Sequence, residues 1–159
     1  MTNLVEIFNN QLLFWSLIAC FTAQLLKIIF NLISEKELRF GVIFETGGMP
    51  SSHSALITGV TSGIGLDLGF NSSVFALSVC ISLIVMYDAS GIRRSAGLQA
   101  TQINKLSKEL TDHSFIDLKE TLGHTKTEVF VGAIIGPLIV LPGIVLLGSP
   151  QNLFSLLLS

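Results

Sequence analysis

The chain has little charge, little cysteine and no excess of basic residues. Only 13% of its 159 residues are Asp, Glu, Lys or Arg, whereas an average soluble domain carries roughly 25%. Nine Lys and Arg stand against 11 Asp and Glu, so we expect no nucleic acid as a partner. Two cysteines are too few for a disulfide framework or a cysteine-rich metal site. Apolar sequence dominates instead, because half of the chain is hydrophobic and the mean hydropathy is +0.70.

Long uncharged runs indicate an integral membrane protein. Four runs of 20 or more residues lack Asp, Glu, Lys and Arg, at 7–26, 46–66, 68–87 and 129–159. A helix needs about 20 mainly apolar residues to cross the hydrocarbon core, and a soluble helix would show a charged stripe. We therefore expect an all-α bundle that forms a single membrane domain over residues 1–159. Its spans are predicted at about 12–33, 51–68, 73–90 and 127–147.

Two segments depart from this simple pattern. The tail at 153–158 is too short to cross a bilayer and is expected at the interface, with a fifth span as the alternative count. The second span contains several hydroxyl side chains and three glycines, which favours a place inside the bundle. Gly59–Gly63 and Gly132–Gly136 are G-x-x-x-G pairs, a spacing that lets helices approach closely in lipid.

The basic residues all fall on one side of the four-span arrangement. They are Lys27, Lys36, Arg39, Arg93, Arg94, Lys105, Lys108, Lys119 and Lys126. The positive-inside rule makes that side cytoplasmic and puts both termini outside.

The connection at 91–126 is long enough to hold structure of its own. Leu98, Ile103, Leu106 and Leu110 recur at near-helical spacing, which predicts an amphipathic helix. It would lie at the cytoplasmic interface or cap the bundle as a solvated helix. We expect a turn at 111–117 and a second short helix through 118–122.

The first candidate cluster is Gly-Gly-Met-Pro-Ser-Ser-His-Ser at 47–54. Pro50 suits the first position of a helix, with Ser51 and Ser52 in its first turn. Free N–H groups, small hydroxyls and the helix dipole make a cradle for an anion such as phosphate, within reach of His53. An ordinary capped helix start with an interfacial histidine is the alternative.

The second cluster, Tyr-Asp-Ala-Ser-Gly-Ile-Arg-Arg at 87–94, closes the third span. Arg93 and Arg94 suit phosphate because a guanidinium binds two oxygens at once, although positive-inside anchoring also explains them. Asp88 ends an apolar run, and a carboxylate at that depth needs a partner. Lys27, at a similar depth in the first span, is the candidate for a structural pair with it.

The third cluster places His124 and Glu128 four residues apart at the start of the fourth span. On a helix they share one face. The carboxylate would orient the imidazole and raise the basicity of its second nitrogen, which makes His124 a candidate nucleophile. Simple core or surface pairing, or a metal site with no evident third ligand, are the alternatives. Together, the three clusters form a phosphoryl-transfer site with no metal or other cofactor, in which fixed cations neutralise the phosphate oxygens.

The motifs resemble a known superfamily. Pro50-Ser51-Ser52-His53 is similar to the Pro-Ser-Gly-His motif of the type 2 phosphatidic acid phosphatases, a superfamily that includes bacterial acid phosphatases and vanadium haloperoxidases. The stretch from 122 to 133 resembles its third motif. The strings at 46–55 and 87–100 resemble the divergent branch, small membrane proteins described as acid phosphatase/haloperoxidase-related. The match covers roughly residues 20 to 140.

The resemblance implies a role for each matching residue. His124 would become a phosphohistidine, Glu128 would orient it, and His53 would protonate the leaving oxygen. Gly48, Ser51 and Ser52 would hold phosphate oxygens. The superfamily's first motif, Lys-x6-Arg-Pro, is absent, so the resemblance leaves its cations to candidates at 27, 36 and 39. Its third motif has an Arg where this chain has a leucine at 118, and Arg93 or Arg94 would have to replace it.

The sequence thus predicts a metal-independent membrane phosphatase. It would hydrolyse a phosphomonoester or pyrophosphate of a lipid, or a small phosphate ester, through a phosphohistidine at the cytoplasmic side. The alternative function is a non-catalytic membrane protein that binds a phosphorylated lipid or scaffolds a partner. The lipid bilayer is the expected surrounding, and a homo-oligomer is an open possibility.

Overall fold

A computed structural model of the chain describes residues 4–36, 38, 40–44, 47–110 and 117–158, which form helices and loops and contain no strand. This confirms the predicted all-α fold. The elements in chain order are η1 (Leu4–Asn9), α1 (Gln11–Glu35), η2 (Phe40–Phe44), α2 (Ser52–Leu68), α3 (Ser73–Ser90), α4 (Ile92–Glu109), α5 (Lys126–Pro142), the π-helical turn η3 (Gly143–Leu147) and α6 (Pro150–Leu158).

Short polar side chains start four of these helices. Asn10, Ser51, Ser72 and Thr125 have extended backbones, and their side chains accept hydrogen bonds from backbone N–H groups in the first turn of α1, α2, α3 and α5. A helix start leaves such N–H groups without intrahelical partners, so each cap defines where its helix begins. Pro50 was predicted at the first position of α2. The structure corrects this, because Ser51 is the cap and Pro50 precedes it.

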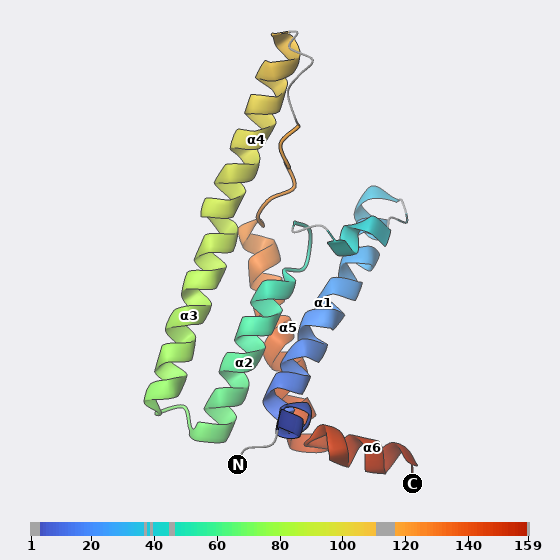
Figure 1. Ribbon diagram of the computed structural model, residues 1–159, viewed down its shortest axis with the longest axis vertical. Coiled ribbons are helices and arrows are strands. Elements are labelled where there is room, and N and C mark those ends of the chain that lie inside the picture. Colours follow the sequence, from blue (N-terminus) through green and yellow to red (C-terminus); the bar gives the residue numbers. More distant parts are fainter. Residues whose placement is uncertain (1–3, 37, 39, 45–46, 111–116, 159) are drawn as a thin grey trace.

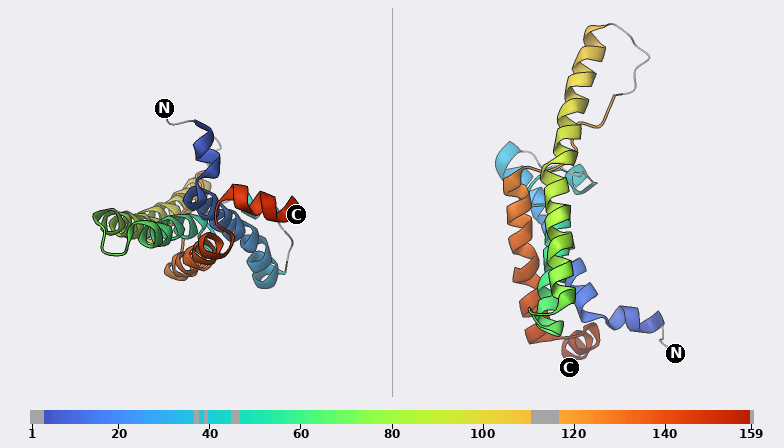
Figure 2. Two further views of the ribbon diagram at one scale, coloured as in Figure 1. Left: turned by 90° about the horizontal axis from the view of Figure 1, so that it is seen from below. Right: turned by 90° about the vertical axis from the view of Figure 1, so that its left-hand side faces the viewer.

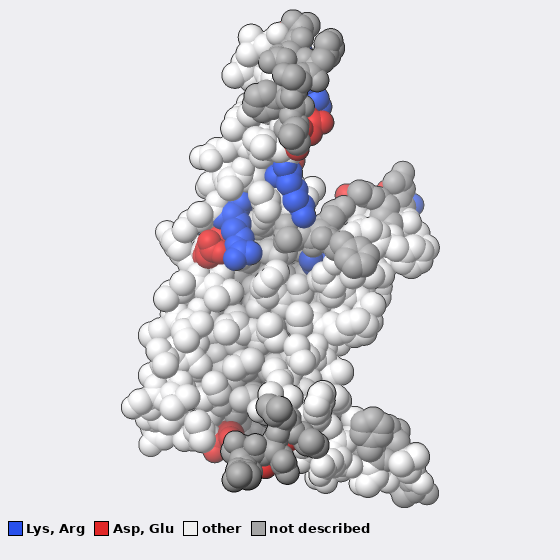
Figure 3. Space-filling view, viewed as in Figure 1, with Lys and Arg blue, Asp and Glu red and all other residues white. Residues whose placement is uncertain are grey.

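The helices α1, α2, α3 and α5 run alternately up and down, and both termini lie at the lower end (Figures 1 and 2). The α1–α2 connection and the start of α5 lie at the upper end (Figure 1). On the face in Figure 3, the Lys and Arg side chains gather in the upper half. This arrangement matches the expected alternation of the basic segments.

Three helical stretches in the described part of the chain are long and apolar enough to cross a membrane. They are α1, the joined α3 and α4 over Ser73–Glu109, and α5 with η3 over Lys126–Leu147. The predicted count of four or five spans is therefore not confirmed, because α2 has 17 residues and is more polar. Helix α6 has nine residues and runs across the lower end of the bundle (Figure 1).

Helix α2 lies inside the bundle, in contact with α1, α3 and α5. Its buried residues are small: serine, threonine, alanine and glycine. The two G-x-x-x-G pairs take part in the α2–α5 contact. A Cβ on Gly136 would lie 2.3 Å from the Ala55 carbonyl oxygen, and one on Gly59 would lie 2.8 Å from Val140. The backbones therefore approach closely, as this spacing allows.

The connection at 91–126 differs from the prediction in two ways. Helix α4 forms, but it continues α3 and projects beyond the bundle instead of lying across its end (Figures 1 and 2). A short helix was predicted through residues 118–122. The structure shows an irregular segment there instead. The predicted turn at 111–117 lies almost wholly outside the described residues.

The glycine contact yields a stability prediction. We expect Gly136→Ala to destabilise the protein, because the added methyl group meets backbone of α2 and overpacking of a filled contact costs about 1–3 kcal/mol. Thermal unfolding of the purified protein in detergent should show a lower midpoint. Gly41→Ala is the matched control, because a Cβ at Gly41 meets nothing within 4 Å. Equal midpoints for the two variants would contradict this account of the α2–α5 contact.

Candidate active site at the starts of α2 and α5

The start of α5 holds His124 in a fixed orientation. Thr125 caps the helix, and its hydroxyl accepts from the Glu128 backbone N–H while the Glu128 carboxylate accepts from the Thr125 N–H, both at 3.2 Å. The same carboxylate oxygen, Oε2, lies 3.0 Å from His124 Nδ1. The cap and the histidine therefore share one oxygen. A hydrogen bond from one ring nitrogen to a carboxylate fixes the orientation of the imidazole.

His124 is almost wholly buried, with 2% of its surface exposed. Its backbone N–H donates to the Ala89 carbonyl in α3 at 2.9 Å. Its second ring nitrogen, Nε2, is buried and has no hydrogen-bond partner among the residues that the structure describes. A buried polar atom without a partner is uncommon in native proteins. With the proton on Nδ1, Nε2 carries the lone pair of the ring.

His124 also lines a small hollow, which it shares with His53. Its lining consists of His53, Val85, Ala89, Arg93 and His124, and its volume is about 20 Å³. The two histidines come from different helices, which a backbone hydrogen bond joins: the Ser51 N–H donates to the Glu128 carbonyl at 3.0 Å. The structure thus brings the two predicted histidines and one arginine together.

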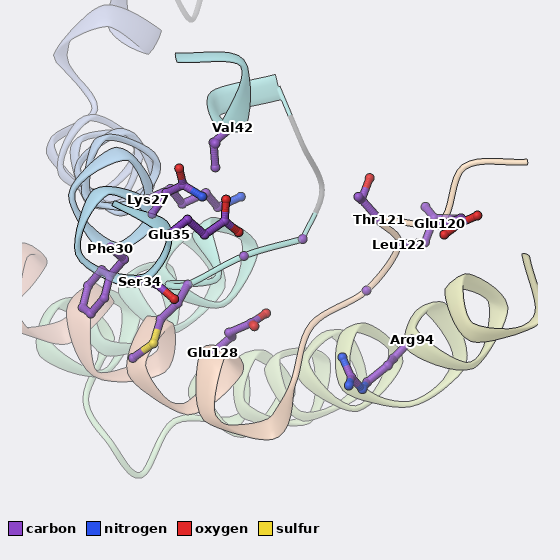
Figure 4. Close-up of a pocket in the computed structure, with 15 residues that line it drawn as sticks. Lys27, Phe30, Ser34, Glu35, Val42, Arg94, Glu120, Thr121, Leu122 and Glu128 are labelled. Carbon is purple, nitrogen blue, oxygen red and sulfur yellow. The ribbon is translucent and has the colours of Figure 1, made fainter. Parts of the chain in front are cut away.

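A larger cavity, of about 500 Å³, lies on the other side of the His124–Glu128 pair. It is lined by Lys27, Gly48, Arg94 and Glu128 from the predicted site. Figure 4 shows Lys27 on the α1 side of this cavity and Arg94 on the α4 side, with Glu128 also on its wall. Lys27 is 2% exposed. The predicted residues therefore fall into two hollows, and the His124–Glu128 hydrogen bond joins them.

Three predicted site residues, Ser51, Ser52 and Asp88, lie outside the two hollows. Ser51 is buried and its hydroxyl accepts from Ser54, from the backbone N–H at 3.3 Å and the side-chain hydroxyl at 3.0 Å. Ser51 and Ser52 line neither hollow, and the hydroxyl of Ser51 instead caps α2. Asp88 was predicted to pair with Lys27, but its Oδ2 lies 2.5 Å from Nε of Arg93, which is closer in sequence and half-exposed.

Sequence reasoning missed the residues that position the segment leading to His124. Asn104, buried in α4, donates to the Leu118 carbonyl at 2.8 Å and accepts from the Leu118 N–H at 2.9 Å. It also donates to Glu120 at 2.8 Å. A Cβ on Gly97 would lie 2.6 Å from the Leu122 carbonyl oxygen, so the segment passes directly over the helix. The only hint in the sequence is a polar asparagine on the helix opposite its apolar positions.

Gly123 completes this path into the site. Its φ of +79° is in the left-handed region that favours glycine. An added Cβ would lie 2.2 Å from the backbone nitrogen of Arg94. The chain therefore turns tightly against the start of α4 just before His124. Among the described residues, no group of three or more His, Cys, Asp or Glu is placed to hold a metal ion.

The fold and site define a class of integral membrane protein, in which the ends of a helical bundle gather two histidines, a carboxylate and cations. Comparison with known proteins gives the family. The chain belongs to the Divergent PAP2 family, whose model matches residues 8–139. It is 40% identical over 151 residues to the uncharacterized membrane protein YuiD of Bacillus subtilis (strain 168), covering 86% of this chain and 96% of YuiD. No solved structure matches. These matches confirm the resemblance to the divergent branch that the sequence motifs indicated.

The role of Asn104 is open to a direct test. Asn104→Ala removes three hydrogen bonds that hold residues 118 and 120 on α4, and a loss of about 1.4 kcal/mol would raise local opening about tenfold. Trypsin should therefore cut after Lys119 about tenfold faster in this variant, as followed by mass spectrometry of the full chain. Gln102→Ala, an exposed change on the same helix, should leave the rate unchanged. Equal rates in the two variants would show that Asn104 does not hold the segment.

Proposed function

We propose that the protein is a metal-independent phosphatase that hydrolyses a phosphomonoester or pyrophosphate of a lipid through a phosphohistidine. The observation that carries this proposal is the buried His124, with Nδ1 on Glu128, an Nε2 that has no partner among the described residues, and a hollow shared with His53 and Arg93. Family membership supports it independently. A lipid substrate suits the position of the site at the end of a membrane bundle.

The proposed reaction has two steps. Nε2 of His124 attacks phosphorus, the bond to the leaving oxygen breaks, and His53 donates a proton to that oxygen. Water then attacks the phosphohistidine, His53 takes its proton, and the P–N bond breaks to release inorganic phosphate. A negatively charged phosphate near His53 would favour its protonated form, offsetting the nearby cations. Glu128 stabilises the positive charge that His124 develops, and Arg93 neutralises phosphate oxygens.

The hollow must widen for this reaction. A volume of about 20 Å³ suits about one water molecule and is too small for a phosphoryl group. The Arg93 side chain forms part of its wall, is 53% exposed, and therefore has room to swing outward. The larger cavity, with Lys27 and Arg94, offers further cations for the rest of a phosphorylated headgroup.

The competing function is binding of a phosphorylated lipid without turnover, or scaffolding of a partner. The cavity volumes favour it, because the roomy cavity holds Lys27 and Arg94 while the hollow in front of His124 is narrow. The two functions differ in one measurable property, which is the release of phosphate.

Phosphate release by the purified protein against a panel of lipid phosphates and pyrophosphates separates the two functions. We expect release by the native chain, and a fall in kcat of about 10²–10⁴-fold for His53→Ala. His124→Ala should abolish release, and Glu128→Gln should lower it less. Glu109→Gln, an exposed change at the end of α4, is the matched carboxylate control. No release from any substrate, together with binding to phosphorylated lipid, would support the competing function.

We further propose that α2 also crosses the bilayer and that the site faces the cytoplasm. The charge pattern supports this orientation, since basic residues mark the cytoplasmic side. In a chain with Cys20→Ala and Cys80→Ala, single cysteines report the side. Asn71→Cys, in the α2–α3 turn, should react with an impermeant maleimide on intact cells stripped of their wall. Lys36→Cys, at the end of α1, and Lys119→Cys should react only after permeabilisation. The reverse pattern would place the site outside, and the same labelling of Lys36→Cys and Asn71→Cys would contradict a crossing by α2.

A further inference from the structure

Helix α4 carries an apolar stripe that nothing in the described part of the chain covers. The stripe-forming positions recur at spacings of four and three residues, which is the heptad spacing of a coiled coil. They are Ile92, Ala96, Gln99, Ile103, Leu106 and Leu110. All six are exposed, and Ile92 and Leu110 are each 68% exposed.

The stripe is distinct from the face by which α4 packs on its own chain. The buried residues of α4 are Gly97, Ala100 and Asn104, and the segment before His124 covers that face through Asn104. A groove opens at the base of the stripe, between Tyr87 and Gln99, where α3 meets α4. Thus α4 packs inward on one face and offers a second, unfilled face outward.

The direction of α4 argues against the bilayer as the cover for this stripe. Helix α4 continues α3 away from the bundle (Figures 1 and 2). The joined α3 and α4 run for 37 residues, whereas about 20 cross the hydrocarbon core. Because α4 carries five charged residues, we place α4 in the water beyond the membrane-spanning α3. An apolar stripe along a helix in water is a site of association.

We propose that the stripe on α4 is the interface through which two copies of this chain pair as a parallel, two-stranded coiled coil. The bilayer gives both copies the same orientation, so their α4 helices stand parallel, and confinement to one membrane raises their effective concentration. This confinement favours pairing through a coiled coil of fewer than three heptads, which would be only marginally stable as an isolated pair of helices.

The charges on α4 fit a second copy as the occupant. In a parallel pair, the flanking positions within α4 are Ser95 opposite Ala100, which is already buried on its own chain, and Gln102 opposite Ser107, so no like charges meet. The nearest lysines, Lys105 and Lys108, lie outside the flanking positions. Gln99 falls at a core position and would meet its counterpart across the two-fold axis. A polar core residue of this kind fixes the register of a pair.

Exposed apolar residues are also found on α3, at Leu77, Ile81 and Ile84. They do not keep the heptad register of the stripe, so the proposed pairing is confined to α4. The proposal stands apart from the proposed phosphatase activity, since none of the stripe residues lines the hollow in front of His124.

Disulfide cross-linking in native membranes tests the pairing in the full chain, with Cys20→Ala and Cys80→Ala as background. Gln99→Cys should give a cross-linked dimer on mild oxidation, because the two-fold axis brings position 99 of both copies together. Lys108→Cys, on the same helix but away from the stripe, should give little. Equal cross-linking of both variants, or none from Gln99→Cys, would overturn the proposal.

The mass of the detergent-solubilised protein provides a second, independent readout. The native chain should have the mass of a dimer, and Leu106→Glu should have that of a monomer. Lys108→Glu should remain dimeric. Helical content by circular dichroism separates loss of pairing from loss of folding, and Gln99→Ala, which introduces no charge, should stay folded and paired. A monomeric native chain, or a folded dimeric Leu106→Glu variant, would contradict the proposal.

Discussion

The arrangement of the site depends on Glu128, whose three polar groups bind three different parts of the protein. Its carboxylate accepts from the Thr125 backbone and holds the His124 ring. Its backbone N–H donates to the Thr125 hydroxyl, which begins α5. Its carbonyl accepts from Ser51, which begins α2. One residue therefore defines a helix start, orients a buried histidine and joins the helix that carries the second histidine.

Close packing between α2 and α5 makes this possible. A backbone hydrogen bond between the two helix starts requires their axes to approach, and glycines on both helices remove the side chains that would prevent it. Gly132 lies so near Ser51 that an added Cβ would be 2.2 Å from its carbonyl oxygen. In lipid, where apolar burial does not drive helices together, such close backbone contact is a main source of association. The packing of the bundle and the geometry of the site thus share the same residues.

Much of this could be predicted from local sequence. Uncharged runs predicted helix bounds within a few residues, and a four-residue spacing predicted that His124 and Glu128 would meet. What the sequence did not predict depends on contacts between distant segments. Residues 118–122 have an apolar pattern compatible with a helix, but hydrogen bonds to Asn104 hold them as an irregular segment. Asp88 pairs with Arg93 because the chain turns between α3 and α4. The prediction that it pairs with Lys27 considered only the depth of the two residues in the membrane.

The division of the site into two hollows also escaped prediction, because it depends on side-chain packing around a single hydrogen bond. The catalytic roles of His53, His124 and Glu128 stay predictions. The most direct test is to mix the protein with a lipid phosphate labelled with ³²P, quench with alkali and digest it. A phosphohistidine account predicts a label on His124 that survives alkali, is lost in acid and is absent from His124→Ala. Phosphate release without any such label would contradict it.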